Sequence, residues 1–223
     1  MDELLREGWL SRCPPDFQQA VLEQGKARRY AAREFVFHLG DGPAGIFGIV
    51  SGAFGVIAAA ERSEPRLGHV WHPGAWFGEG PLMGGQRRRF AVQARTPGEV
   101  IYLSIEDIDA LCRSTPAWHR LFGTLAFENL AVAAGIITDL QLRRSEARLA
   151  AVLLRAAGRT VLTPQRKLLP VRLSQAELGE MANVSRQLVN ATLRRWQAAG
   201  WIDLRYGEVV ITSREQLLGC TAE

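Results

Sequence analysis

Three side chains between residues 186 and 190 carry hydrogen-bonding groups suited to reading nucleic-acid bases: Arg186, Gln187 and Asn190. Arginine can form two parallel hydrogen bonds to guanine, and glutamine or asparagine can do the same with adenine. At spacings of one and four residues these side chains share one side of a helix, whereas Val189 and Leu193 fall on the opposite side. We therefore predict a helix with one buried face and one polar face that is free to bind.

Two helix starts lie only eleven residues apart in this region. Ser174 and Glu177 have the spacing of a capping box, and Ser185 offers a second N-cap. Two short helices joined by a tight turn form a helix-turn-helix, whose second helix enters the major groove of DNA. The apolar runs 201–204 and 209–212 flank a glycine-containing turn and predict a β-hairpin beside it, which is a wing.

We assign base contacts to the three polar residues named above, and phosphate contacts to Ser185, Arg194, Arg195 and Arg205. Phosphate contacts add affinity but little sequence information. The alternative is a helix face that is only solvated. The predicted DNA-binding residues are Ser174, Gln175, Ser185, Arg186, Gln187, Asn190, Arg194, Arg195 and Arg205.

Charge is distributed unevenly along the 223 residues, whose net charge is +4. Residues from Arg143 onward carry 13 Lys and Arg against 7 Asp and Glu, whereas residues 1–142 carry 14 against 16. The basic charge thus coincides with the predicted DNA reader. The chain starts without the apolar segment of a secretory signal, and we identify no stretch that would span a membrane, so we expect a cytoplasmic protein.

Short apolar runs broken by glycine recur from about residue 27 to residue 105. Strands at this close spacing indicate an antiparallel barrel or a double-sheet jelly roll, which small helices within residues 2–25 precede. The predicted strands are residues 35–37, 46–50, 54–57, 67–71, 90–94 and 100–103.

A long helix is predicted from Thr115-Pro116 to about Leu142, because no proline interrupts it. Its apolar residues fall on two sides, so it needs two partners. One is the β region, and the other is the same helix of a second subunit, as in a coiled coil; burial within one chain is the alternative. Asp139 to Ser145 is the predicted hinge, with Ser145 capping the next helix, and Lys167 to Leu173 is predicted to form a strand.

Neither a metal site nor a disulfide framework is predicted, because the three cysteines are far apart. His69, His72 and Glu79 would be the ligands of a β-roll metalloenzyme, which is the remote alternative. Residues three apart on a strand point to opposite faces, so the two histidines would not converge. We therefore predict that the protein is not an enzyme.

The order of β roll, long helix and winged helix-turn-helix resembles the cyclic-AMP receptor protein and FNR (Crp/Fnr) family of bacterial transcription regulators over nearly the whole chain. The most specific signatures are Gly-Ala-Trp-Phe-Gly-Glu at 74–79, Arg88 ahead of the strand at 91–94, and Ser185-Arg186-Gln187. The resemblance implies an α+β fold with an N-terminal double-stranded β-helix (jelly-roll) domain like those that bind cyclic nucleotides, a dimerisation helix and a C-terminal winged helix-turn-helix domain. We expect these to span residues 1–114, 115–142 and 143–223.

The partners that this resemblance implies are double-stranded DNA with a palindromic operator, RNA polymerase and a second copy of the chain, joined through Trp118 to Leu142; no membrane is implied. The family is switched by a small effector bound in the β roll, which the sequence does not identify. A protein that shares the β roll and regulates through cyclic nucleotides without binding DNA is another alternative, but it leaves residues 174–212 unexplained.

The candidate effector residues also follow from the resemblance. In cyclic-nucleotide binders of this fold the glutamate at Glu79 holds a ribose hydroxyl and the arginine at Arg88 pairs with the cyclic phosphate. Two departures count against cyclic AMP: Arg89 stands where a Ser or Thr is expected, and two alanines replace a Thr-Ser pair on the long helix that reaches the adenine. Arg88 could instead pair internally with Glu79, or the arginines could hold another anion. The candidate set is Gly78, Glu79, Arg88, Arg89, Ala133 and Ala134.

No cofactor is assigned. The FNR branch holds an iron–sulfur cluster on clustered N-terminal cysteines, and Cys13 alone cannot do so, which rejects that cluster. Haem sensing stays open, since nothing in the spacing selects among the available axial ligands His38, His69, His72, His119 and Cys112.

Overall fold

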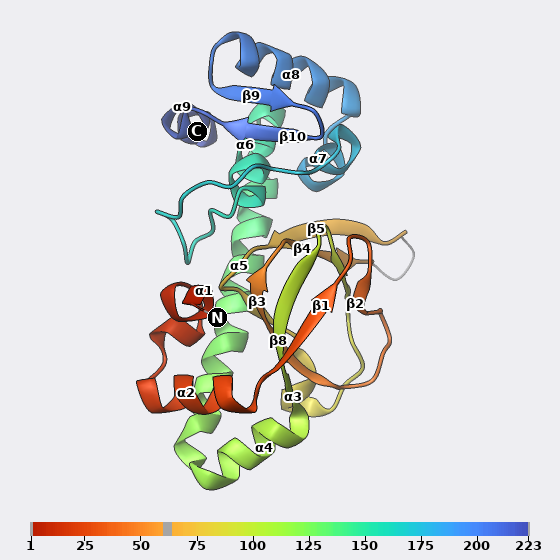
Figure 1. Ribbon diagram of the computed structural model, residues 1–223. Coiled ribbons are helices and arrows are strands. Elements are labelled where there is room, and N and C mark those ends of the chain that lie inside the picture. Colours follow the sequence, from red (N-terminus) through yellow and green to blue (C-terminus); the bar gives the residue numbers. More distant parts are fainter. Residues whose placement is uncertain (1, 60–63, 223) are drawn as a thin grey trace. The chain divides into compact units, whose positions relative to one another are not determined.

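The computed structural model describes residues 2–59 and 64–222 of the chain (Figure 1). Two compact units make up this part of the protein. One contains the residues up to 65 and those from 71 to 131, and the other contains residues 66–70 and those from 132 onward. The boundary between the units at 131/132 falls within one long helix, α5 (His119–Gln141).

Two four-stranded sheets form the β roll, which confirms the predicted double-sheet fold. Strand pairs such as β3 with β8 and β4 with β7 run antiparallel. The first sheet has the order β1 (Lys26–Tyr30), β8 (Gly98–Ser104), β3 (Gly45–Ser51) and β6 (Trp76–Phe77), and the second has the order β2 (Phe35–Phe37), β7 (Ala91–Ala94), β4 (Phe54–Ala58) and β5 (Arg66–Trp71).

Strand β1 was not among the predicted strands. Its sequence, Lys-Ala-Arg-Arg-Tyr, leaves four of five positions exposed, so it lacks the apolar alternation that marks a half-buried strand. It lies at the edge of its sheet, where charged side chains discourage pairing with other chains. Its hydrogen bonds to β8 hold it in place, and these depend on no local apolar signal.

Aromatic side chains fill the interior of the β roll. Phe77 stacks on Phe47 and on Trp71, with ring centroids 5.3 and 4.8 Å apart. Phe37 and Phe54 join the same buried cluster. Such contacts contribute about 0.5–1.5 kcal/mol per pair beyond the area that they bury. The roll is therefore held together by a packed aromatic core.

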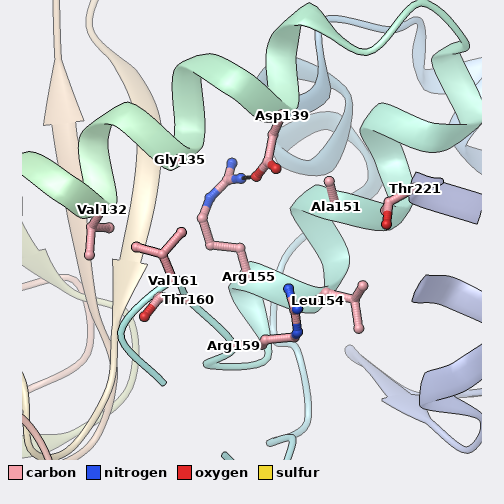
Figure 2. A pocket seen from close by; sticks show the side chains of 10 residues that line it. All are labelled: Val132, Gly135, Asp139, Ala151, Leu154, Arg155, Arg159, Thr160, Val161 and Thr221. Atoms are coloured by element: carbon pink, nitrogen blue, oxygen red, sulfur yellow. Dashed lines mark hydrogen bonds and ion pairs between the residues drawn. The ribbon is translucent and has the colours of Figure 1, made fainter. Parts of the chain in front are cut away.

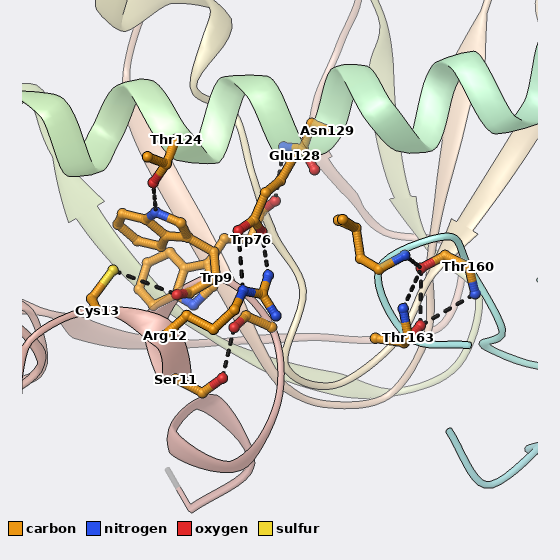
Figure 3. Close-up of polar contacts among 12 residues, drawn as sticks. Trp9, Ser11, Arg12, Cys13, Trp76, Thr124, Glu128, Asn129, Thr160 and Thr163 are labelled. Carbon is orange, nitrogen blue, oxygen red and sulfur yellow. Dashed lines mark hydrogen bonds and ion pairs between the residues drawn. The ribbon is translucent and has the colours of Figure 1, made fainter. Parts of the chain in front are cut away.

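Helices cover one side of the first unit. They are α1 (Asp2–Arg6), a 3-10 turn (Leu10–Arg12), α2 (Pro15–Gln24) and α4 (Ile105–Ser114), while the short α3 (Gly80–Gly84) follows strand β6. Trp9 packs against Phe122 of α5 and donates its indole N–H to the Leu121 carbonyl at 2.8 Å and to the Thr124 hydroxyl at 3.0 Å. Arg12 forms an ion pair with Glu128 (Figure 3). These contacts anchor the first half of α5 to its own unit.

Helix α5 follows a 3-10 turn (Pro116–Trp118), and the Thr115 side chain does not cap it. Pro116–Gln141 is long and apolar enough to cross a membrane by length and composition, so the expectation that no such stretch exists is wrong. The large apolar side chains Phe127, Leu130 and Ile137 are 71%, 64% and 60% exposed. Their spacing of three and seven residues is that of a coiled-coil seam.

The second unit contains the predicted helix-turn-helix and wing. Its elements after α5 are α6 (Ser145–Ala156), α7 (Gln175–Ala182), α8 (Arg186–Ala198), the hairpin β9 (Ile202–Arg205) and β10 (Glu208–Ile211), and α9 (Arg214–Thr221). Two local predictions are wrong. Ser145 is the first helical residue and does not cap α6, and residues 167–173 contribute only the single bridge between Val171 and Val209.

The turn between α7 and α8 depends on two backbone positions. Asn183 ends α7 in the left-handed conformation, with φ 51°, which asparagine tolerates better than most residues. The Val184 amide then donates to the Gly179 carbonyl at 2.9 Å. A β-carbon on Gly179 would lie 2.8 Å from the Val184 carbonyl oxygen, which is closer than side-chain carbons approach in folded proteins. The tight turn therefore requires glycine at position 179.

Gly179→Ala should lower the stability of the second unit by about 1–3 kcal/mol, because the added methyl group forces the turn apart. Thermal unfolding followed by circular dichroism measures the change. Gly219→Ala is the matched control, since a β-carbon on Gly219 of α9 meets nothing within 4 Å and alanine is the better helix former. Equal melting temperatures for Gly179→Ala and the wild type would contradict this account of the turn.

Candidate functional site

The polar face of α8 is exposed because its other face is buried. Val189, Leu193 and Trp196 are at most 1% exposed. Arg186 and Gln187 at the first turn are exposed, and Asn190 is half-buried. The helix start also has free backbone N–H groups and a partial positive charge, both of which favour phosphate. The three predicted base-reading residues thus share one accessible surface.

Both helix starts are fixed by serine caps, as predicted. The Ser174 hydroxyl accepts from the Glu177 amide at 3.2 Å while the Glu177 carboxylate accepts from the Ser174 amide at 2.8 Å. The Ser185 hydroxyl accepts from the Leu188 amide at 3.2 Å. Ser185 therefore has a structural role as an N-cap in addition to its predicted phosphate contact.

A side-chain hydrogen bond links the two helices at this surface. Asn190 Nδ2 donates to Gln175 Oε1 at 3.0 Å. This bond fixes the orientation of the Asn190 amide, whose second Nδ2 hydrogen and carbonyl oxygen can still pair with a base. Gln175 therefore positions the side chain of Asn190, one of the three predicted base-reading residues.

The remaining predicted arginines are placed differently from one another. Arg194 is exposed on α8. Arg195 lies on another side of the helix, where its Nη2 is 2.6 Å from the Glu146 carboxylate of α6, so the structure does not bring it together with Arg186. Glu146 also accepts the Trp196 indole N–H at 2.8 Å. Sequence reasoning missed Glu146, because nothing local marks it as the partner of two residues fifty positions away.

The wing carries its own charge balance. Arg205 Nε donates to the Asp203 carboxylate at 2.8 Å, and Arg205 Nη1 lies 3.9 Å from Glu208. Gly207 occupies the left-handed region with φ 74° in the turn, and Tyr206 at the tip is fully exposed. Arg205 is solvent-exposed as predicted, but its charge is shared with two carboxylates of the same hairpin.

The second candidate site is the interior of the β roll around Arg88, which is 3% exposed. Its two terminal nitrogens donate to the backbone carbonyls of Gly78 at 2.7 Å and Gly45 at 2.9 Å. The guanidinium carbon lies 4.2 Å from the centre of the Phe37 ring. Burial lowers the pKa of Arg88. Both terminal nitrogens of Arg88 are therefore already bonded to backbone carbonyls of the β roll.

Glu79 is close to Arg88 in the sequence, but the environment of its carboxylate is different from that of the Arg88 guanidinium. Burial raises the pKa of Glu79, and a hydrogen bond with the Asn129 side chain acts in the opposite direction. Asn129 Nδ2 also donates to the Trp76 carbonyl at 3.1 Å (Figure 3). Among the bonds of the described residues, Arg88 pairs with backbone carbonyls rather than with Glu79, so the predicted internal pairing is not a direct hydrogen bond.

The other effector candidates are at the surface. Arg89 is exposed and donates to Gln86 Oε1 at 3.3 Å. Ala133 and Ala134 are exposed on α5. Alanine offers no hydrogen-bonding side chain at either position.

No group of three or more metal-ligating side chains occurs among residues 2–59 and 64–222. His69 and His72 are buried, and His72 follows strand β5 in a turn, where its carbonyl accepts the Ala75 amide. Burial raises the pKa of the Cys13 thiol to about 11, so this thiol stays protonated at neutral pH, whereas a metal binds the thiolate.

Two family models match the chain. The cyclic nucleotide-binding domain matches residues 27–115, and the Crp-like helix-turn-helix domain matches residues 147–220. A cyclic nucleotide-gated potassium channel of Mesorhizobium japonicum is 30% identical over 114 residues, which are 51% of this chain and 30% of the channel. The chain thus matches less than a third of the length of that relative.

Solved structures share the fold at low identity. FixK2 from Bradyrhizobium japonicum is 17% identical, with a TM-score of 0.73 over 89% of this chain and 98% of that one. The c-di-GMP responsive global regulator CLP from Xanthomonas campestris is 21% identical, with a TM-score of 0.67 over 89% and 99%. A CRP/FNR family transcriptional regulator from Thermus thermophilus is 21% identical, with a TM-score of 0.68 over 89% and 99%. At these identities the likeness establishes the fold.

Arg88→Gln should destabilise the first unit even without any ligand, by about 2–4 kcal/mol, because two buried carbonyls lose their charged donor. Urea unfolding followed by tryptophan fluorescence measures this change. Arg89→Gln removes the same charge from an exposed neighbour and should change stability by no more than about 0.5 kcal/mol. If both variants unfold at the wild-type urea midpoint, Arg88 is not the internal support described above.

Proposed function

Because this chain belongs to the Crp/Fnr family of DNA-binding regulators, as its two domains together show, we propose that it acts as a homodimer on a palindromic operator. The proposal rests on one observation above all, namely the accessible row of Arg186, Gln187 and Asn190 at the start of α8. Two such helices in a dimer would enter successive major grooves about 34 Å apart. We assign the protein no catalytic role.

The chemistry of the side chains divides the proposed DNA contacts into base contacts and phosphate contacts. Arg186 and Gln187 are the base-reading residues, and Asn190, oriented by Gln175, is the third. Ser174, Ser185, Arg194 and Arg205 contact phosphate in this proposal. We leave Arg195 out of the interface, because Glu146 already holds its guanidinium. The Asp203 carboxylate beside Arg205 weakens the electrostatic contribution that the wing can make.

The exposed seam of α5 supports the homodimer. Phe127, Leu130 and Ile137 share one side of the helix, and Ala134 and Gln141 continue the same heptad positions. A second copy of the same helix presents the same seam, so the two seams can pack symmetrically. Such pairing would remove three large apolar side chains from water and would supply the second partner that the sequence requires.

A second copy explains this helix better than a lipid bilayer does. A membrane-spanning helix is apolar on all sides. Here the side opposite the seam carries Glu128, which pairs with Arg12, and its apolar residues Phe122 and Leu125 are buried within the first unit. We therefore propose a cytoplasmic protein with no membrane partner. Contact with RNA polymerase is part of the same proposal, since the protein would act at promoters.

The effector of the β roll is proposed only by the chemistry of the groups around it. The chain has a cyclic nucleotide-binding domain, but Arg88 could pair with a cyclic phosphate only by giving up its bonds to Gly78 and Gly45. The exposed Arg89 and the alanines at 133 and 134 add no polar group that the family uses for a nucleotide. We therefore propose that the β roll responds to an effector held by other groups, with a cyclic nucleotide as the alternative.

Selection from random duplexes should return inverted repeats, and Arg186→Ala should then weaken binding to the selected site by about 5–150-fold, with little effect on random DNA. Fluorescence anisotropy at fixed salt measures both affinities. Arg195→Ala removes the same charge from the same helix and should leave the ratio of specific to random binding unchanged. Equal effects of the two substitutions on that ratio would refute the assigned reading face.

Leu130→Asp should convert the dimer to a monomer, because two carboxylates would meet in an apolar seam. Sedimentation equilibrium gives the molecular mass directly. Leu39→Asp is the control, since Leu39 is also a leucine exposed by 51% but lies outside α5. A Leu130→Asp chain that stays dimeric, or a wild-type chain that is monomeric, would rule out this interface.

A further inference from the structure

A small cavity lies within the second unit, between the end of α5, helix α6 and the loop at residues 158–161 (Figure 2). Its volume is about 80 Å³, enough for several waters or for one anion of the size of phosphate. Val161 lines the cavity and is 59% exposed, so the cavity reaches solvent there. Gly135 contributes a wall without a side chain.

The most unusual group in this cavity is the guanidinium of Arg155, which is 4% exposed. Figure 2 shows the Arg155 side chain extending from α6 to Asp139 on α5, where Nη1 donates to the carboxylate. Its Nε and Nη2 are buried without a hydrogen-bond partner among the groups of the described residues. Leaving a charged donor unpaired away from water is strongly unfavourable. These two N–H groups therefore need an acceptor.

A second arginine lines the same cavity. Arg159 follows Arg155 by four residues, and its Nε is likewise buried with no acceptor among the residues that the structure describes. Asp139 is the only carboxylate among the lining residues, and its charge is balanced by Arg155. Arg159 leaves an excess of one positive charge. The cavity is therefore suited to an anion.

The loop that closes the cavity is held by its own side chains. Thr160 and Thr163 share a hydrogen bond between their hydroxyls at 2.9 Å (Figure 3). Thr163 Oγ1 donates to the Gly158 carbonyl at 3.0 Å. The Thr163 amide donates to Thr160 Oγ1 at 3.2 Å. These bonds hold the loop without using the arginines, so Nε and Nη2 of Arg155 and Nε of Arg159 remain available to a ligand.

We propose that this cavity is a binding site for a phosphate group, in which the unpaired N–H groups of Arg155 and Arg159 donate to its oxygens. Guanidinium N–H groups match the geometry and charge of phosphate oxygens. A phosphate offers more acceptor oxygens than the single Asp139 carboxylate already present. None of the predicted effector residues lines the cavity, although Ala133 and Ala134 lie between its lining residues Val132 and Gly135 on α5, and the proposal does not depend on the proposed DNA binding.

Isothermal titration of the full chain with inorganic phosphate, against chloride at equal ionic strength, tests the site. One phosphate should bind per chain, and Arg159→Gln should weaken this binding about tenfold or more, the loss of one charge-assisted contact. Lys167→Gln removes the same charge from an exposed position in the same unit and should bind phosphate as the wild type does. Equal binding by wild type and Arg159→Gln, or no binding by the wild type, would overturn the proposal and leave a cavity that holds only water.

A second variant and a second ligand sharpen the result. Asp139→Asn keeps Arg155 and removes the negative charge of the carboxylate, so it should bind phosphate more tightly than the wild type. Unchanged or weaker binding would contradict the assignment.

Adenosine monophosphate distinguishes the source of the phosphate group. Binding with the same dependence on Arg159 assigns phosphate monoesters, and binding of inorganic phosphate alone assigns the free anion. No DNA is present in these titrations, so their failure would leave the proposed DNA-binding function untouched.

Discussion

The burial of one side of α8 is the constraint on which the proposed DNA-binding surface depends. Val189, Leu193 and Trp196 lie in the core of the second unit, and each large apolar side chain contributes about 1.5–3 kcal/mol when fully buried. Glu146 adds a directional contact by accepting the Trp196 indole N–H. With this side fixed, rotation of the helix is prevented. Arg186 and its neighbours must therefore face solvent, because they occupy the positions that the core does not use.

The β roll contains a charged side chain, that of Arg88, in its interior. Arg88 is buried among aromatic rings, and burying an unpaired cation would be prohibitive. The backbone carbonyls of Gly78 and Gly45 supply the missing acceptors. Gly78 can adopt its φ of 97° and lie close to Arg88 because it has no side chain. The motif that suggested a ligand site in this region is thus an internal support of the fold.

Local signals in the sequence predicted the parts of the fold that depend on local chemistry. Serine caps located α7 and α8, and glycine-punctuated apolar runs located most strands of the roll. Strand β1 escaped because its side chains are exposed and its bonds come from a distant strand. The ion pairs of Arg195 and Arg155 could not be predicted for the same reason. Their carboxylate partners, Glu146 and Asp139, lie on other helices of the chain. A side chain can be predicted to be polar, but its partner depends on the finished fold.

Helix α5 carries three features that bear on regulation. Its first half is anchored by Trp9 and Arg12, its exposed seam has the pattern of a dimer contact, and Asp139 near its end is bound by Arg155 of α6. A ligand can shift an equilibrium only if it binds one arrangement better than another. A phosphate held by Nε and Nη2 of Arg155 would place its negative charge beside the Asp139 carboxylate, so it would favour arrangements in which the end of α5 is less tightly bound to α6. The strength of that repulsion sets the limit on any coupling between the cavity and the helices that carry the proposed DNA-binding surface.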